Sequence, residues 1–454
     1  MIRGRPPTVR IVTLGCAKNT VDTEVMSGLL AEEGCRVVDR GRADVAIVNT
    51  CGFIRDAKEE SIGEILAWGK AREKGRIRRL VVAGCLSSRY REDLPKLLPE
   101  VDLFVGPADL PALPALIRNL FDGEVPRVRV AEGTLPEEAY RRRDPGEGIA
   151  SAYLKIQEGC DNRCSYCTIP MIRGPLKSRS RESLLSEARM LVRRGAREIN
   201  MIGQDITSYG ADRGERGALV PLVREVCRLR GVRWVRLLYL HPGRIDDSLI
   251  DLLAAEKKVC RYLDIPVQHI DPGILAAMGR RYTPDDVYGL VARLRDRLPG
   301  IFLRTSLIVG FPGETAKAFE RLLRFVHETR WDYLGVFPYS REDGTSAAAL
   351  RSRVPEAVRR QRASRVQDVQ ADILAARNAA MVGSEIEVLV EKTLGRGRAV
   401  GRHRGQAPEV DGNVTLGGYA GPAGRIFKAR VTGSREWDLF AKPIDTGADA
   451  CILT

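Results

Sequence analysis

Three cysteines fall within eight residues of this chain, in the stretch EGCDNRCSYC that holds Cys160, Cys164 and Cys167. Cysteines that serve only as small apolar side chains do not explain such a cluster. A structural zinc site needs four ligands, and neither a second cysteine pair nor a nearby HxxxH motif accompanies this one. Three thiolates on a short loop suit a cubane iron–sulfur cluster instead, and they leave its fourth iron open. The CxxxCxxC spacing therefore predicts a cluster that can bind a further ligand.

A second set of cysteines follows three strand-like runs near the N-terminus. The runs VRIVTLG, ADVAIVNT and RLVVAG are rich in β-branched residues and lead into Cys16, Cys51 and Cys85. Helical patterns follow the first two runs, so residues 1–121 are expected to form a small parallel α/β domain. Ligands gather at the carboxyl ends of parallel strands, where all three cysteines would lie. This set predicts a second three-thiolate site, and its alternative is three separate core cysteines. The cysteines outside both sets are expected to be structural: Cys35, Cys227, Cys260 and Cys451.

The rest of the chain divides into further parts. A charged stretch with Pro and Gly, residues 122–149, is expected to be a linker. Six strand–helix units over residues 150–381, the last helix trailing, predict a partial TIM-like (βα)6 barrel. The CxxxCxxC loop directly follows the first of these strands, at the end where such barrels place active sites.

The C-terminal part has a different pattern of predicted secondary structure. Short strands separated by Gly and Asp turns over residues 382–448 predict a small antiparallel, OB-like β-barrel, followed by a tail at 449–454. Residues 380–454 contain 10 Lys and Arg against 9 Asp and Glu, which gives this part almost no net charge. The chain as a whole has a net charge of +14. That excess suits a polyanionic partner, or it reflects an arginine-rich solvated surface.

The sequence also indicates the cellular compartment of the protein. No apolar run approaches the ~18 residues of a membrane span, and the run IVTLGCA is too short for a secretion signal. We therefore expect a cytoplasmic protein without a membrane partner, in which clustered cysteines are metal ligands or catalytic thiols.

CxxxCxxC after the first strand of a partial barrel resembles the signature of the radical S-adenosylmethionine (SAM) superfamily. The resemblance implies that Cys160, Cys164 and Cys167 hold a 4Fe-4S cluster whose free iron binds SAM, which is cleaved to a radical that removes a hydrogen atom from carbon. It also implies that an aromatic residue and two glycine-bearing segments line the SAM pocket. In this chain they are Tyr166, the GQD segment of Gly203, Gln204 and Asp205, and Gly310 and Gly313 of SLIVGFPGET.

The order of the three parts resembles the methylthiotransferases. This resemblance implies that Cys16, Cys51 and Cys85 hold a second 4Fe-4S cluster for sulfur transfer. It further implies two SAM molecules, one a methyl donor and one a radical source, with flavodoxin or ferredoxin as reductant and a separate sulfur donor. The C-terminal barrel would then be a TRAM domain.

Several segments are similar to the branch that adds methylthio to an aspartate β-carbon of small-subunit ribosomal protein S-twelve. They are LGCAKNTVDTE, NTCGFIRDAKEESI, GCLSSRY, AYLKIQEGCDNRCSYCTIP, YLDIPVQHI and APEVDGNVTL. The near-neutral C-terminal barrel also suits a basic ribosomal protein better than RNA. One departure is Ala17, where that branch commonly has proline. The alternatives are a tRNA 2-methylthio-adenosine methylthiotransferase and a non-catalytic iron–sulfur module that binds ribosomes. We expect a monomer.

Overall fold

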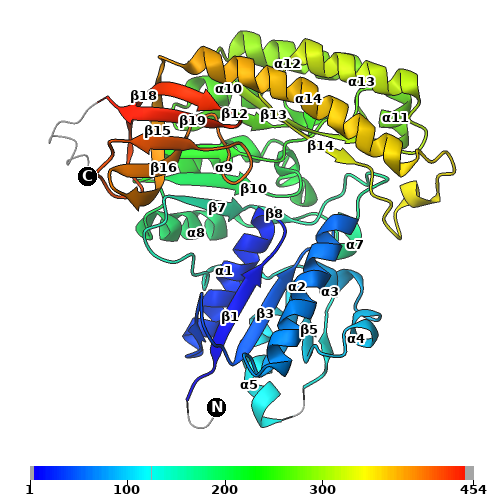
Figure 1. The fold of residues 1–454 in the computed structure, drawn as a ribbon, viewed down its shortest axis with the longest axis vertical. Helices are drawn as coiled ribbons and strands as arrows, with labels where there is room; N and C mark the ends of the chain where they lie inside the picture. Colours follow the sequence, from blue (N-terminus) through cyan, green and yellow to red (C-terminus); the bar gives the residue numbers. More distant parts are fainter. Residues whose placement is uncertain (1–4, 124, 445–454) are drawn as a thin grey trace.

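The computed structural model describes residues 5–123 and 125–444, which form three packed parts. The first domain lies at the bottom of Figure 1, the six-stranded barrel above it, and the C-terminal barrel beside the strands of the latter. None of the described helices is both long enough and apolar enough to cross a membrane. The expected fold class is confirmed: a parallel α/β domain, a partial barrel and a small β-barrel.

The first domain is one parallel sheet with the strand order β2-β1-β3-β4-β5-β6. Every residue of its central strand β3, VAIVNT, is buried, as expected for a strand covered on both faces. The order reverses between β1 and β3, and such switch points open ligand crevices at the carboxyl ends of the strands. The strands are β1 (Thr8–Thr13), β2 (Arg36–Val37), β3 (Val45–Thr50), β4 (Arg79–Gly84), β5 (Leu103–Val105) and β6 (Val128–Arg129). The helices are α1 (Ala17–Glu32), α2 (Arg55–Glu73), α3 (Cys85–Arg89), α4 (Leu94–Leu97) and α5 (Leu113–Asp122).

The segment expected as a linker, residues 122–149, takes part in the fold. It contributes β6 to the edge of the first sheet and a short helix, α6 (Glu137–Tyr140), to the junction with the barrel. Arg142 passes so close to α1 that a Cβ added at Gly28 would lie 1.5 Å from the Arg142 carbonyl oxygen. The domain boundaries stay predictions, and the expected tail with Cys451 lies outside the described residues.

The partial barrel has six parallel strands in sequence order, as predicted. Its strands are β7 (Ser151–Lys155), β10 (Glu198–Ile202), β11 (Trp234–Leu237), β12 (Val259–Asp264), β13 (Phe302–Val309) and β14 (Tyr333–Pro338). Its helices are α8 (Arg181–Arg193), α9 (Leu219–Arg228), α10 (Asp247–Ala255), α11 (Pro272–Ala277), α12 (Pro284–Arg297), α13 (Ala316–Thr329) and α14 (Glu356–Met381). A short ribbon of β8 (Gln157–Glu158) and β9 (Lys177–Ser178) flanks helix α7 (Ile169–Arg173) beyond the end of β7.

The C-terminal part is a closed five-stranded barrel in the order β15-β16-β17-β19-β18. Its strands are β15 (Glu385–Gly395), β16 (Arg398–His403), β17 (Val414–Gly417), β18 (Ile426–Arg435) and β19 (Asp438–Pro443). The expectation of an antiparallel barrel needs one correction, because β17 and β19 pair in parallel to close it. Asp411, in the loop between β16 and β17, accepts a hydrogen bond of 2.6 Å from the Tyr262 hydroxyl and so docks this barrel onto the interior of the larger one.

Candidate active site

The first trio, defined as Cys16, Cys51 and Cys85, lies at the carboxyl ends of β1, β3 and β4, which are adjacent strands. Gly15, just before Cys16, has a φ of +97°, and a Cβ there would lie 2.9 Å from Cβ of Cys51. A glycine is therefore needed for the chain to turn this close to the neighbouring cysteine. The structure brings these three predicted residues together.

The thiols of the first trio influence one another. Burial raises the pKa of the Cys51 thiol to about 12, and the nearby Cys85 and Cys16 thiols add to that rise. Burial also raises the pKa of Cys85, although Arg173 opposes the rise. Cys16 is exposed, whereas Cys51 and Cys85 are buried. The trio therefore has one open side, next to Cys16.

Asn19, in the first turn of α1, ties the three strand ends together. Its side-chain amide donates hydrogen bonds to the carbonyl oxygens of Leu14 (2.7 Å) and Thr50 (3.0 Å). Its side-chain oxygen accepts from the Cys85 thiol at 3.7 Å. Asn19 is only 1% exposed, so this set of contacts is shielded from water. Sequence reasoning missed this residue.

The second trio, defined as Cys160, Cys164 and Cys167, lies on the loop between β8 and α7. Burial raises the pKa of the Cys160 thiol to about 11 and that of Cys167 to about 12, and neighbouring thiols contribute to both shifts. The Ile169 backbone N–H donates to Sγ of Cys167 at 3.5 Å, the kind of contact that stabilises a thiolate ligand. Ser165 anchors the loop through its backbone N–H, which donates to the Met278 carbonyl oxygen at 3.0 Å.

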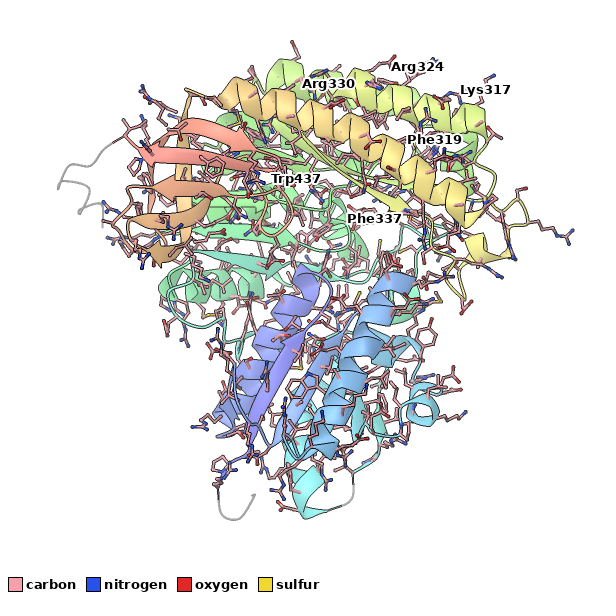
Figure 2. All side chains as sticks on the ribbon, in the orientation of Figure 1. Lys317, Phe319, Arg324, Arg330, Phe337 and Trp437 are labelled. Carbon is pink, nitrogen blue, oxygen red and sulfur yellow. The ribbon has the colours of Figure 1, made fainter. Side chains whose placement is uncertain are left out.

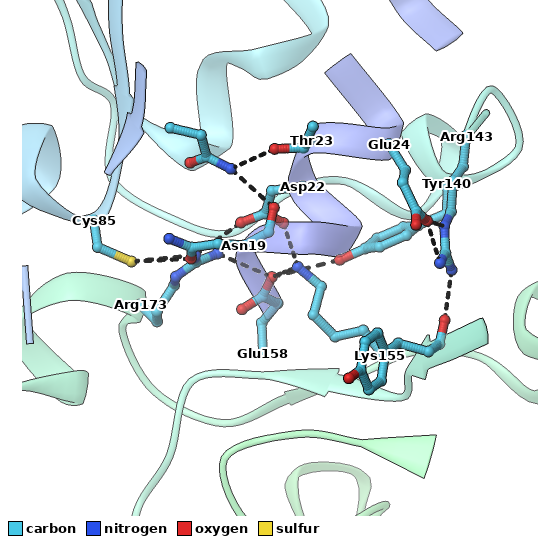
Figure 3. A network of polar contacts seen from close by, with 12 residues as sticks. Asn19, Asp22, Thr23, Glu24, Cys85, Tyr140, Arg143, Lys155, Glu158 and Arg173 are labelled. Atoms are coloured by element: carbon cyan, nitrogen blue, oxygen red, sulfur yellow. Dashed lines mark hydrogen bonds and ion pairs between the residues drawn. The ribbon is translucent and has the colours of Figure 1, made fainter. Parts of the chain in front are cut away.

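Two contacts join the segments that carry the two trios. The Arg173 guanidinium, on α7 beyond the second trio, donates to Sγ of Cys85 at 3.2 Å (Figure 3). The Thr168 hydroxyl, next to Cys167, donates to the Phe53 carbonyl oxygen at 3.3 Å. Helix α3, which begins at Cys85, also packs against α7, so the segments that carry the two sets of thiols lie side by side although 75 residues or more separate them along the chain.

A buried set of four charges holds this region in place (Figure 3). Asp22 on α1 binds Lys155 of β7 at 2.5 Å and Arg173 at 2.8 Å, and Glu158 binds the same two cations. All four side chains are at most 4% exposed. Burial alone would raise the pKa of Asp22, but Arg173 and Lys155 outweigh it and lower that pKa. Two cations and two carboxylates balance, so this interface is neutral as well as ordered.

The predicted SAM-lining residues lie within the CxxxCxxC loop and just after β10 and β13, at the carboxyl ends of the barrel strands. Asp205 accepts a hydrogen bond of 2.8 Å from Asn162, which lies within the CxxxCxxC loop. Asp205 also forms an ion pair with Arg244. Oε1 of Gln204 is buried and has no hydrogen-bond partner among the described residues. Asn49, Gln157, Asn200 and Gln370 also have a buried amide oxygen without a partner, but Gln204 directly precedes Asp205, which contacts the CxxxCxxC loop.

The other predicted SAM residues occupy nearby positions. Gly203 packs so closely on Gln157 that a Cβ added at Gly203 would lie 2.7 Å from Cγ of the Gln157 side chain. The Tyr166 hydroxyl accepts a hydrogen bond of 2.9 Å from Arg280, and burial raises the pKa of Tyr166 well above its usual value.

Gly310 and Gly313 follow β13. The Arg359 side chain covers Gly310, whereas the backbone N–H of Gly313 donates to the Ser352 carbonyl oxygen at 2.7 Å. Gly310 also lines a cavity of about 240 Å³ beside Tyr339 and Arg359.

These residues fit the expected cofactors. Among the described residues, no three His, Cys, Asp or Glu side chains meet closely enough to hold a single metal ion. A cubane cluster makes a different demand, because each thiolate binds a separate iron and the thiols surround a larger body. Each trio supplies three free thiols of this kind, and the unpartnered Gln204 oxygen lies beside the second trio. Ala17 is the first residue of α1, a position that accepts alanine as well as proline, so the departure there changes no ligand position.

Exposed apolar side chains lie around the two trios. Phe53 follows Cys51 by two residues, Met171 lies on α7, and Phe337 is near the end of β14; they are 36%, 44% and 47% exposed. Figure 2 shows Phe337 on the part of the barrel that faces the first domain. Exposed apolar residues grouped near a site are typical of a surface that binds a macromolecule.

Known proteins resemble this chain along nearly its whole length. Residues 154–326 match the radical SAM superfamily, residues 8–106 match the uncharacterized protein family UPF0004, and residues 382–444 match the TRAM domain. Among solved structures, the radical SAM methyltransferase TsrM from Kitasatospora setae, with cobalamin and a 4Fe-4S cluster bound, has a TM-score of 0.55 and 19% identity. The match covers 75% of this chain and 74% of that one. This likeness shows the fold alone.

Curated relatives are much more similar. The ribosomal protein uS12 methylthiotransferase RimO of Syntrophotalea carbinolica is 45% identical, over 96% of this chain and 97% of the relative. The proteins of the same name from Geotalea uraniireducens and Heliobacterium modesticaldum are 44% and 43% identical, over 96% and 98% of this chain and 98% of each relative. Membership of the radical SAM superfamily implies one 4Fe-4S cluster and SAM. The likeness to the curated relatives spans all three parts of the chain, and the protein therefore belongs to the RimO family of ribosomal protein uS12 methylthiotransferases.

Proposed function

We propose that this protein is a radical SAM transferase that inserts a methylthio group at the β-carbon of an aspartate on ribosomal protein uS12, the small-subunit protein S-twelve. The observation that supports the proposal is the contact between Cys85 of the first trio and Arg173, on the helix that follows the second trio. One trio alone would suit many radical SAM enzymes, whereas a second trio on an adjoining segment supplies a place for the sulfur. The relatives quoted above carry the uS12 name, which does not favour the tRNA alternative.

Each trio has a separate role in this proposal. Cys160, Cys164 and Cys167 bind the cluster that holds SAM, and Cys16, Cys51 and Cys85 bind a second 4Fe-4S cluster that carries the sulfur. When bound, the clusters and two SAM molecules supply one methyl group, one hydrogen-abstracting radical and the inserted sulfur.

The chain's own groups position these parts. The buried oxygen of Gln204 accepts a donor from SAM, and Asp205 with Asn162 fixes the loop beside it. Tyr166 stays neutral and closes the apolar side of that loop. The buried Asn19 and Arg173 exclude water from the contacts around Cys85 and so protect that thiol from side reactions.

The partners follow from the same chemistry. A single-electron donor, flavodoxin or ferredoxin, and a sulfur donor are needed for each cycle. Because the substrate is a ribosomal protein, we place the reaction in the cytoplasm, with the enzyme acting as a monomer.

The test is the intact mass of uS12 from cells with and without the gene. We expect a deletion strain to lose the mass of one methylthio group, and wild type but not the Cys164→Ala variant to restore it. An unchanged uS12 mass together with loss of 2-methylthio-adenosine from tRNA would move the activity to RNA. Absence of SAM cleavage by reduced, reconstituted wild type would instead leave only a non-catalytic module.

The two trios can be tested separately. Cys164→Ala should abolish SAM cleavage and keep the iron of the first trio. Cys51→Ala should spare SAM cleavage and stop sulfur transfer, and continued methylthiolation by that variant would contradict the role given to the first trio.

A further inference from the structure

Lys18 is a buried lysine with no carboxylate in ion-pair range among the described residues. It lies in the first turn of α1, two residues after Cys16, and is 8% exposed. Its ammonium group makes no hydrogen bond or ion pair with any residue that the structure describes. The contact it does make is with the face of the Tyr239 ring, whose centroid is 3.0 Å from the Lys18 nitrogen.

Such a cation is costly. Lysine is almost never fully buried unless it is paired, and a buried charge normally has an anion and hydrogen bonds around it. A contact with an aromatic face offsets only part of the lost hydration. The other buried cations nearby obey the rule, since Lys155 and Arg173 each bind two carboxylates. Lys18 differs from both of them.

The position of Lys18 indicates a role in binding. Tyr239 follows β11 at the carboxyl end of the barrel and has a φ of +65°, a strained backbone for a tyrosine and common at binding sites. Tyr239 is only partly buried and Cys16 is exposed, so the Lys18 ammonium lies close to a surface that a substrate can reach. Asp264 of the barrel also acts on Lys18, but it lies outside ion-pair range of Lys18 and its Oδ1 pairs instead with Nε of Arg304 at 3.8 Å.

We propose that Lys18 binds the side-chain carboxylate of the target aspartate and so selects an acidic residue for methylthiolation. This inference rests on the proposed function and names the group that recognises the substrate. A substrate carboxylate that reaches Lys18 supplies a carboxylate partner that the described residues do not provide. The carboxylate is bonded directly to the β-carbon, so its capture places that carbon between the two trios.

The test measures the affinity of the reconstituted full-length enzyme for a labelled synthetic peptide that spans the target aspartate of uS12. Wild type and Lys18→Met are each titrated with the Asp peptide and with a matched Asp→Asn peptide. Each single change should weaken binding by roughly 10- to 100-fold, the range for a hydrogen bond to a charged group. The two changes together should weaken it no further than either alone, because both remove the same interaction. Lys18→Arg should keep the preference for Asp, and Lys70→Met, an exposed lysine of α2, serves as the matched control.

The outcomes separate the inference from the proposed function. Wild type that binds both peptides equally, or Lys18→Met that keeps the wild-type preference for Asp, would overturn the role of Lys18 while methylthiolation of the Asp peptide continued. A loss of iron from the first trio without any change in peptide preference would assign Lys18 to the Cys16 thiolate instead. Wild type that neither binds nor methylthiolates the Asp peptide would overturn the proposed function, and the inference with it.

Discussion

Replacement of Asp22 by asparagine tests the buried charges that join the first domain to the barrel. Asp22→Asn keeps the shape of the side chain but removes its charge, and it leaves Lys155 and Arg173 facing Glu158 alone. The site then contains one uncompensated buried positive charge. Loss of one member of a buried ion pair typically costs about 3–5 kcal/mol, and the near-zero exposure of these groups places Asp22→Asn in that range.

The assay is urea unfolding of the full-length protein, followed by circular dichroism. Asp39→Asn, an exposed change in the same domain, is the matched control and should shift stability by less than about 0.5 kcal/mol. The double variant Asp22→Asn with Lys155→Met restores neutrality, because Arg173 and Glu158 still balance. We therefore expect the double variant to be more stable than Asp22→Asn alone. A double variant whose loss equals the sum of the two single losses would refute the charge-balance argument.

Three further changes follow from other contacts. Arg402 and Arg236 outweigh burial and lower the pKa of Glu198 from 4.5 to about 2. Because this pKa is lower in the folded than in the unfolded protein, ionised Glu198 stabilises the fold above about pH 4.5. That stabilisation is lost as the pH falls towards 2. Glu198→Gln should therefore flatten the fall in melting temperature over this acid range, which corresponds to a contribution on the order of 3 kcal/mol, and an unchanged slope would contradict this. Gly159→Ala places a Cβ 1.9 Å from the backbone carbonyl oxygen of Pro175 at a φ of +65°, so iron bound by the adjoining second trio should fall, as measured by iron content per chain. Glu342 binds two cations of the first domain and is 1% exposed, so Glu342→Gln should speed limited proteolysis between that domain and the barrel, and an unaltered cleavage rate would speak against this role.

The sequence predicted the parts that depend on local pattern. The six cysteines of the two trios directly follow apolar β-branched runs or lie on one loop, so their convergence at strand ends followed from the topology of parallel sheets. The six barrel strands were predictable for the same reason, because each is a short apolar run between helical patterns.

Long-range polar contacts were not predictable. Arg173 reads as a surface residue at the end of a short helix, yet its partners Asp22 and Cys85 lie 151 and 88 residues away. Lys18 and Asn19 read as ordinary residues of a helix start, and only the run of polar side chains beside Cys16 hinted at a buried role. The parallel pairing of β17 with β19 likewise depends on how the barrel closes, which no local pattern records.

The order of synthesis gives the interface around Asp22 a further consequence. A nascent chain that ends at residue 121 lacks β6, which edges the first sheet, and lacks both cations that bind Asp22. One of these two cations, Arg173, is also the donor to the Cys85 thiol. Domains generally fold in the order in which they leave the ribosome, but here the first domain needs residues up to 173 before its cysteine site is complete. We therefore expect that iron loading of the first trio waits until the start of the barrel has been translated.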